Sequence, residues 1–267
     1  MRIYYVNLDR RTDRRSEMEA QFQRLGLDAE RISALTPQHV TAEQREAHCD
    51  PRNWHWMTEA ELSCSLSHLK ALQTFLADGT EYALILEDDV VLSPSLPGFL
   101  TALEKTYPTW DILRLETYLD GQRLMPIPDS QIAGISVRRS WSWCAGAAAY
   151  ILSKKAARAI LESGEFLRLQ TDGALFNPYE SLSRRLTVRH CFPGLAVQSD
   201  RIDAERNDSD LAAARKRHEE PIPLPWPQRT FRKLAGVAKT EILYGSQRQF
   251  HTIFGRARKV MVPFKAD

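Results

Sequence analysis

Three consecutive acids, Glu87-Asp88-Asp89, follow the apolar run 82–86. Such a run is typical of a β-strand buried on both faces, so the pattern predicts three carboxylates at the carboxyl end of a strand. Carboxylates crowded there repel one another unless a cation neutralises them, and oxygen ligands suit Mg²⁺ or Mn²⁺. Glu87 and Asp89 are therefore candidate metal ligands. The alternative is a solvated turn, because acids are common in loops.

Four arginines, Arg10, Arg11, Arg14 and Arg15, follow the short β-rich run 2–8. In an open α/β sheet, the segment after the first strand is where a phosphate or a base is contacted, and guanidinium groups bind phosphate well. The alternative is the solvated start of a helix, which is the usual meaning of a charge run. Arginines at a helix N-terminus oppose the helix dipole, however, so four of them favour an anionic partner.

Four more residues are candidates because of their place in the pattern. Glu61 and His68 are seven residues apart on one predicted helix, so they lie on the same side of it and can meet a ligand together. A single histidine beside an apolar face is more often structural, and that alternative stays open. Glu116 ends a predicted strand, and Asp172 lies in a Thr-Asp-Gly segment. Each carboxylate can act as a general base toward a hydroxyl group, or simply cap a turn.

Strands and helices alternate along the part of the chain that carries these residues. Thr58 and Glu61 have the spacing of a capping box at the start of a helix. The order predicts an α/β fold with a mainly parallel sheet, helices on both of its faces, and ligands outside the carboxyl ends of the strands. The predicted strands are 2–8, 82–86, 110–115 and 147–152, and the predicted helices are 17–27, 41–48, 58–78 and 153–164.

Composition divides the 267 residues into two parts. We expect one domain over residues 1–214 and a basic, proline-containing tail over 215–267, which holds 12 Lys/Arg against 4 Asp/Glu although the whole chain carries only +2. Such a tail can face nucleic acid, anionic lipid or an acidic substrate. Interspersed apolar residues, among them Phe231 and Leu234, favour an amphipathic helix on a membrane surface over a nucleic-acid arm.

Composition and absent motifs narrow the class of protein. Hydrophobic residues make up 43% and charged residues 26%, which are ordinary values for a globular protein. No run approaches the roughly 20 apolar residues of a membrane span, and the first residues do not form a signal peptide. The four cysteines form no CxxC pair, so we expect reduced thiols and a cytoplasmic protein, peripheral on the inner membrane if the tail binds lipid. Sequence signatures of hydrolases, zinc proteases and P-loop proteins are absent.

Four motifs, taken in order, resemble glycosyltransferase family 25, the bacterial lipopolysaccharide galactosyltransferases and their collagen-modifying relatives. The resemblance covers about residues 2–200. It departs from the usual family pattern at Ala60 and Ser63, where glycines are typical. The motifs are YVNLDRR at 5–11, ELSCSLSH at 61–68, ILEDDV at 85–90 and GAAAYILS at 146–153.

The resemblance implies a glycosyltransferase A-like fold and metal-dependent, inverting transfer of a hexose from a nucleotide sugar such as UDP-galactose. The metal would be Mn²⁺ or Mg²⁺ held by Asp89 and Glu87, and the acceptor a saccharide or lipid-linked saccharide of lipopolysaccharide or another cell-surface glycan. Asp172 would be the base, with Glu116 second, and Arg14 or Arg15 would stabilise the leaving group. The residues implied to bind the donor are Asn7, Leu8, Arg11, Arg14, Glu61, His68, Glu87 and Asp88.

Two other functions remain open at this point. A non-catalytic membrane-surface adaptor could retain the same fold, because the basic tail alone explains binding to an anionic surface. A nucleotide-sugar hydrolase or an inactive relative would keep the same acids. No nucleic-acid partner is expected.

Overall fold

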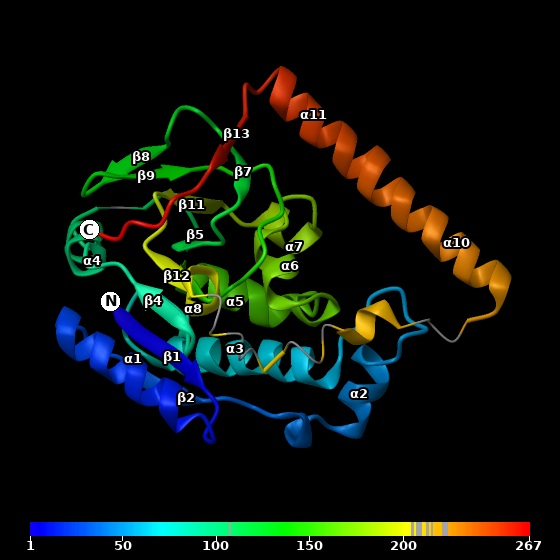
Figure 1. Ribbon diagram of the computed structural model, residues 1–267, viewed down its shortest axis with the longest axis horizontal. Helices are drawn as coiled ribbons and strands as arrows, with labels where there is room; N and C mark the ends of the chain where they lie inside the picture. Colours follow the sequence, from blue (N-terminus) through cyan, green and yellow to red (C-terminus); the bar gives the residue numbers. More distant parts are fainter. Residues whose placement is uncertain (107, 204–205, 207–209, 212–213, 215, 221–223) are drawn as a thin grey trace.

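A central sheet organises the protein, whose computed structural model is shown in Figure 1. The structure describes every residue except 107, 204–205, 207–209, 212–213, 215 and 221–223. Within the described ranges, the sheet has eight strands in the order β2-β1-β3-β10-β5-β11-β9-β8. Their bounds are β1 Arg2–Asn7, β2 Glu30–Ser33, β3 Tyr82–Glu87, β5 Ile112–Arg114, β8 Ser130–Ile132, β9 Ile135–Arg138, β10 Ala149–Ser153 and β11 Val188–Phe192.

The sheet is mainly parallel, as predicted. The pairs β1–β2, β1–β3 and β5–β11 are parallel, whereas β10 runs antiparallel to both β3 and β5. The pairs of β9 with β11 and with β8 are also antiparallel, so all the strands except β9 and β10 point the same way. The predicted strand 147–152 therefore exists as β10 but with reversed direction, which a pattern of apolar residues does not reveal.

Both faces of the sheet are covered, which explains the continuous apolar runs in its strands. Alternate residues of β3 enter opposite cores: Leu84 and Leu86 pack on the side of α1 and α4, and Ala83 and Ile85 on the side of α3 and α5. All four side chains are fully buried. The larger helices of the two layers are α1 Thr12–Leu25, α3 Glu59–Ala77, α4 Leu96–Leu103 and α5 Lys154–Ser163.

Two helices begin at the capping residues that the sequence predicts. Thr58 caps α3 in a capping box with Glu61, and the Ser153 hydroxyl accepts a hydrogen bond from the Ala156 amide at the start of α5. Helix α1 begins at Thr12, five residues before the predicted start at 17, so Arg14 and Arg15 lie in its first turn and Arg11 is its N-cap residue. The remaining short helices are η1 Pro37–His39, α2 Ala42–His48, η2 Phe166–Arg168, α6 Thr171–Phe176, α7 Ser181–Arg185, α8 Ser199–Ile202 and η3 Arg217–Glu219.

A second, smaller sheet lies at the carboxyl ends of the central strands. The predicted strand 110–115 is found as β5, and directly after it the chain leaves the central sheet and enters the second sheet as β6. Strand β12 is parallel to β6 and antiparallel to β4, and the Ser199 amide donates to the Asp89 carbonyl at 2.8 Å. The strands are β4 Val90–Leu92, β6 Glu116–Thr117 and β12 Ala196–Gln198.

The C-terminal part forms a rod along the outside of the molecule and then returns to the body (Figure 1). The rod comprises α10 Trp226–Val237, the π-helical stretch η4 Ala238–Tyr244 and α11 Gly245–Ile253. After it, β13 Arg258–Met261 pairs with β7 Gly121–Leu124. Residues 258–261 therefore pack on the part of the chain assigned to the first domain, and the division at residue 214 stays a prediction. Across the described residues, the structure has no helix with both the length and the apolar character that a membrane crossing requires.

Candidate active site

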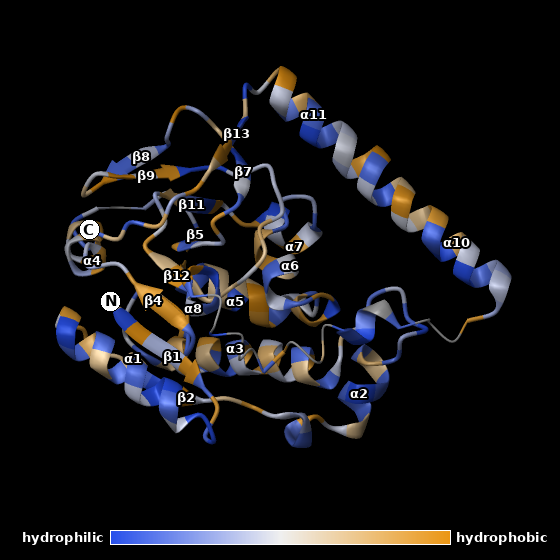
Figure 2. Ribbon diagram, viewed as in Figure 1, coloured by the Kyte–Doolittle hydropathy of each residue, from blue (hydrophilic) through white to orange (hydrophobic). Residues whose placement is uncertain are grey.

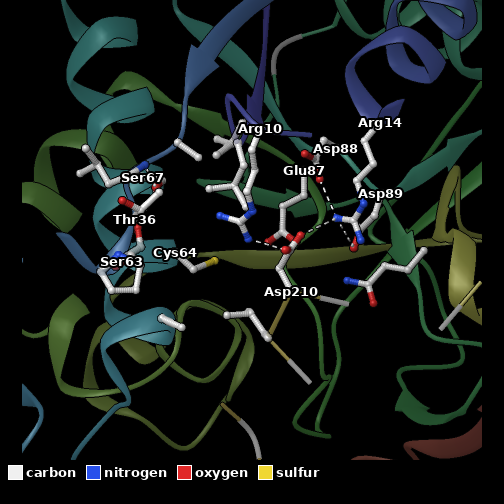
Figure 3. A pocket seen from close by; sticks show the side chains of 18 of the residues that line it. Arg10, Arg14, Thr36, Ser63, Cys64, Ser67, Glu87, Asp88, Asp89 and Asp210 are labelled. Carbon is white, nitrogen blue, oxygen red and sulfur yellow. Dashed lines mark hydrogen bonds and ion pairs between the residues drawn. The ribbon is translucent and has the colours of Figure 1, made fainter. Parts of the chain in front are cut away.

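Two adjoining pockets open where β1 and β3 end. The strand-end pocket has a volume of about 370 Å³ and is lined by Leu8, Arg10, Arg14 and all three acids of the triplet, among others. The Asp172 pocket has a volume of about 340 Å³ and lies beside it. The two share the side chains of Cys64, Glu87, Gln198 and Leu211. Glu87, from the end of β3, therefore faces both spaces, and Figure 3 shows it between Arg10 and Arg14.

Asp88 is held by neutralising partners. Its two carboxylate oxygens accept hydrogen bonds from Asn7 Nδ2 at 2.7 Å and from Arg14 Nη1 at 2.9 Å. Burial raises the pKa of Asp88, and the Arg14 charge opposes that rise. Asn7 in turn accepts from Arg31 Nε at 2.8 Å, so its side chain ties the end of β1 to that of β3. The structure thus brings Asn7 and Asp88 together through a hydrogen bond between their side chains, and their binding of the donor stays a prediction.

Asp89 lacks such neutralisation. Its Oδ1 is buried and has no hydrogen-bond partner among the described residues, and Arg14 Nη1 lies 3.7 Å from its Oδ2. Burial and the neighbouring Glu87 raise the pKa of Asp89 well above its ordinary value, although Arg14 acts in the opposite direction. Such a carboxylate is costly to keep unless a cation meets it.

The oxygen atoms around Asp89 fit a divalent cation. Asp200, which lines the same pocket, also has a buried Oδ1 that accepts no hydrogen bond from the described residues, although Arg201 Nε lies 3.4 Å from it. These carboxylate oxygens, together with Glu87, are a donor set suited to Mg²⁺ or Mn²⁺. Cys64, His68 and Glu87 also bring one potential ligand atom each within 4.8 Å of the others. Because sulfur and imidazole nitrogen are softer ligands, that second set suits Zn²⁺ better than Mg²⁺.

His68 lies behind Glu87 and holds it in place. The imidazole is fully buried, with Nδ1 2.9 Å from Tyr150 Oη and Nε2 3.1 Å from Glu87 Oε1. It lines neither of the two pockets. The structure therefore gives His68 a positioning contact to Glu87 in place of the ligand contact expected from the sequence.

The arginine cluster faces a carboxylate supplied by a distant part of the chain. Asp210 accepts from Arg10 Nη2 and, at 2.8 Å, from Arg11 Nη1, and Arg14 Nη1 lies 3.9 Å from it (Figure 3). Arg10 and Arg14 line the strand-end pocket. Arg15 instead pairs with Glu19 on the exposed side of α1, so it is placed away from the pocket.

Asp172 and Glu116 both contact the backbone turn at Gly146, but they differ in whether a ligand in a pocket can reach them. Asp172 lines its pocket and accepts from the Gly146 amide at 2.9 Å and the Gly173 amide at 2.7 Å. Burial raises its pKa, and these two amides oppose the rise. Glu116 is 3% exposed, lines neither pocket and accepts from the Ala148 amide at 2.9 Å. Burial raises the pKa of Glu116 to about 7, against the effect of Arg114.

Gly146 separates these two carboxylates because no other residue fits. Its φ is +85°, a conformation that L-residues rarely adopt, and a Cβ atom there would lie 2.3 Å from Glu116 Oε1. The glycine of the fourth motif thus lets the backbone press against Glu116 and offer its amide to Asp172.

Glu61 belongs to the far wall of the Asp172 pocket. Its Oε2 accepts from the Thr58 amide at 2.8 Å and lies 2.7 Å from His218 Nε2, while Gln170 Nε2 donates to Oε1 at 3.3 Å. Glu61 Oε2 is therefore already used in capping α3. His218, which contacts the same oxygen, lies beyond the predicted domain boundary at residue 214.

Sequence reasoning missed Asp200, Asp210 and His218. They follow the last motif, in a region of weak periodicity, and no spacing connects them to the strand ends. In the sequence, only the residue types of these three positions, two aspartates and a histidine, indicate a functional role. The structure gives each of them a place: Asp200 lines the strand-end pocket, Asp210 contacts Arg10 and Arg11, and His218 contacts Glu61.

Comparison with known proteins places this α/β domain among the glycosyltransferases. The family model described as "Glycosyltransferase family 25 (LPS biosynthesis protein)" matches residues 1–175. The chain belongs to glycosyltransferase family 25, which confirms the resemblance seen in its motifs, and its mainly parallel sheet is the architecture that the resemblance implied.

Individual relatives cover different shares of the chain. The lipooligosaccharide biosynthesis protein lic2B of Haemophilus influenzae is 25% identical over 210 residues, which are 74% of this chain and 76% of that protein. A glycosyltransferase 25 family member of Aedes aegypti is 27% identical over 174 residues, covering 60% of this chain. The chain spans only 28% of the length of that insect relative.

Among solved structures, a glycosyltransferase involved in glycosylation of the major capsid of PBCV-1 aligns over 81% of this chain and 97% of its own. The TM-score is 0.41 and the identity 11%.

Proposed function

We propose that the protein is a metal-dependent, inverting hexosyltransferase that moves a hexose, with galactose from UDP-galactose as the expected case, to a saccharide acceptor of lipopolysaccharide or another cell-surface glycan. The observation that carries the proposal is the shared wall at Glu87 between two pockets of different chemistry. One pocket offers arginines and unpartnered carboxylate oxygens, and the other offers Asp172. A transfer reaction needs these two spaces to touch.

The strand-end pocket is assigned to the nucleotide sugar. Arg10, Arg11 and Arg14 converge on the Asp210 carboxylate, an anion in the place where we expect a phosphate oxygen of the donor. Leu8 adds an apolar surface for the nucleoside. Asn7 and Asp88 fix the strand ends around this space.

Asp89, Glu87 and Asp200 would hold Mn²⁺ or Mg²⁺ at the edge of this pocket. The support is the pair of buried oxygens, Oδ1 of Asp89 and Oδ1 of Asp200, that accept no hydrogen bond from the described residues. When bound, the cation supplies positive charge to offset the negative charge that develops on the departing diphosphate. Arg14 reaches the same region and adds a second positive charge there.

Asp172 is assigned as the general base, and Glu116 is the second choice. The acceptor hydroxyl would give its proton to Asp172 while its oxygen attacks the anomeric carbon from the side opposite the diphosphate. The bond from that carbon to the diphosphate oxygen breaks as the new glycosidic bond forms, which inverts the configuration. Only Asp172 of the two lines a pocket, and its raised pKa makes it a stronger base than an ordinary aspartate.

A donor panel tests this proposal. Purified protein is incubated with UDP-, GDP- and CMP-sugars, with and without Mn²⁺, and nucleotide release is measured with and without saccharide acceptors. We expect release from one donor class, dependent on metal and lost in Asp89→Asn, whereas the control Asp28→Asn, at an exposed carboxylate outside both pockets, keeps it. If no nucleotide sugar binds or reacts under any of these conditions, the proposal is wrong.

A membrane-surface role of the rod is the second proposal, and it is compatible with the first. Large apolar side chains project from the rod into solvent, and basic residues such as Arg229 and Lys233 lie among them. The orange bands along α10 and α11 in Figure 2 mark this apolar content. Exposed apolar area beside positive charge suits the surface of an anionic bilayer. The exposed residues are Trp226, Phe231, Leu234, Val237, Ile242, Leu243, Phe250, Ile253 and Phe254.

Vesicle sedimentation tests the membrane role. We expect the full chain to sediment with vesicles containing anionic phosphatidylglycerol and to do so less when Phe231, Leu234 and Ile242 are all changed to Ser. Equal sedimentation of the two proteins would contradict the role of the rod. A protein that binds vesicles but no nucleotide sugar would instead be a membrane-surface adaptor that retains the fold.

A further inference from the structure

A third pocket, about 400 Å³ in volume, lies between the body and α11, and we call it the basic pocket. Arg139, Arg184, Arg189, His190 and His251 line it, and none of the described residues in its wall is acidic. A hollow with several cationic side chains and no carboxylate favours an anionic ligand. Its size exceeds the needs of a single small ion and falls within the range of sites for small molecules. Its uncharged lining residues include Ser140, Trp141, Phe176, Ser183 and Gln247.

His190 gives the basic pocket a buried polar group that awaits a partner. The side chain is 4% exposed, and its Nδ1 has no hydrogen-bond partner among the described residues. An unpaired buried polar nitrogen is destabilising, so in the tautomer that carries its proton on Nδ1 a ligand oxygen that accepts from this nitrogen would recover stability. Burial, Arg114 and Arg189 lower the pKa of His190 well below its ordinary value.

Trp141 fixes two of the basic side chains, although burial and Arg139 lower the pKa of His251. The Arg139 guanidinium lies 4.0 Å from the centre of the indole ring, and the His251 ring stacks on it at 3.3 Å with an interplanar angle of 9°. Tyr179 Oη donates to the Trp141 carbonyl at 2.7 Å, which anchors this segment to the body. The wall is therefore organised before any ligand arrives, and α11 completes it through His251 and Gln247.

Two of the arginines keep their charge available. Arg189 is paired with Asp129, but the described residues provide no ion pair to Arg139 or Arg184. Burial and the nearby Arg189 lower the pKa of Arg139, so a negative ligand would relieve repulsion between these two guanidinium groups. The arrangement resembles the unsatisfied cation cluster of an oxyanion site.

Two segments contribute residues to the walls of both the basic pocket and the Asp172 pocket: helix α6 and the chain before β10. Thr171 and Asp172 line the one pocket, and Phe176 at the other end of α6 lines the other. Six helical residues span about 9 Å. Trp141 and Trp143 likewise line the basic pocket and the Asp172 pocket respectively.

We propose that the basic pocket binds the phosphate group of a phosphorylated saccharide, with Arg139, Arg184 and the Nδ1 group of His190 as its contacts. Assigning this saccharide to the acceptor rests on the proposed function. The binding of a sugar phosphate does not. The C-terminal rod then has a second task, because α11 closes the wall of this pocket.

Calorimetric titration tests the pocket without any nucleotide sugar or turnover. The probes are glucose 6-phosphate, inorganic phosphate and glucose. We expect saturable binding of glucose 6-phosphate and none of glucose. Arg184→Gln and Arg139→Gln should each weaken binding about tenfold, the loss of one charge-assisted hydrogen bond. Arg185→Gln, its neighbour on α7 and outside the pocket, should leave binding unchanged.

Arg10→Gln serves as the control for binding in the strand-end pocket. Loss of binding in Arg10→Gln with retention in Arg184→Gln would place the anion at the strand ends and overturn the proposal. Saturable binding of inorganic phosphate without binding of glucose 6-phosphate would show a free-anion site and reject the saccharide. Failure of all three probes would reject the pocket, and nucleotide-sugar transfer would still be open to test because it uses other residues.

Discussion

The strand ends bury carboxylate oxygens that accept no hydrogen bond, whereas the C-terminal rod exposes apolar side chains to water. At the strand ends, Asp89 Oδ1 and Glu116 Oε1 are buried without hydrogen bonds among the described residues. On the rod, Phe231, Ile242 and Phe254 are 71%, 70% and 72% exposed. Each arrangement is unfavourable for folding, because folding buries apolar side chains and leaves few buried polar groups without hydrogen bonds.

The difference teaches that both regions are built for something outside the chain, but for different things. A buried carboxylate with an oxygen that accepts no hydrogen bond favours binding of a cation or a proton, and an exposed apolar face favours contact with another apolar surface. Features that lower stability are expected where function requires them. The family match ends at residue 175, so it covers the acids of the strand ends and not the rod.

Glu116→Gln tests whether the strand ends contain a buried acid that lowers stability. A carboxyl whose pKa is raised from 4.5 to about 7 binds more protons in the folded state, so the stability it contributes is lost as pH rises through that range. We expect the free energy of unfolding of the wild type to fall between pH 4.5 and pH 8 by on the order of 3 kcal/mol more than that of the variant. Urea unfolding across this range measures the difference.

Glu46→Gln, at an exposed position of α2, is the control for the loss of a carboxylate. It should follow the wild-type pH dependence. A Glu116→Gln curve that also parallels the wild type would show that Glu116 is not a strained buried acid.

Gly146→Ala sharpens the view that the backbone at the strand ends is shaped around carboxylates. The new Cβ would meet Glu116 at 2.3 Å in a backbone of positive φ, so we expect a loss of more than about 2 kcal/mol. Gly134→Ala has a similar φ of +78° but open space around the Cβ, and should lose about 1 kcal/mol. Thermal unfolding compares the two, and equal losses would refute the role of the Glu116 contact.

Leu234→Ser tests the other half of the comparison and has the smallest expected effect. Because Leu234 is 65% exposed, we expect the free energy of unfolding to change by less than about 0.5 kcal/mol. Chemical denaturation measures it. A loss of 2 kcal/mol would mean that the rod packs its apolar face within the protein, and the membrane role would lose its basis.

Several elements could be predicted from the sequence because local chemistry determines them. Thr58 with Glu61 and Ser153 with Ala156 form helix caps at the predicted places. The apolar run before Glu87 is a strand buried on both faces, so the acids lie at its end as expected. The direction of β10 was not predictable, because strand pairing is decided by distant partners.

The candidate site was predictable only where motif and strand end coincide. Asn7, Asp88 and Arg14 form one contact network as their positions suggested. His68, in contrast, is turned toward Tyr150 and Glu87, and helical spacing alone does not distinguish a ligand contact from such a buried one. Asp210 and His218 reach the pockets through tertiary packing of a segment with weak periodicity.

The central claim is that transfer takes place across the Glu87 wall with Asp172 as base. The most direct test compares Asp172→Asn with the wild type in two measurements on the same protein: calorimetric binding of UDP with Mn²⁺, and the rate of hexose transfer. We predict unchanged UDP binding and a transfer rate lower by about 10²–10⁴-fold, the usual contribution of a general base. Unchanged transfer, or loss of UDP binding in step with transfer, would contradict the account.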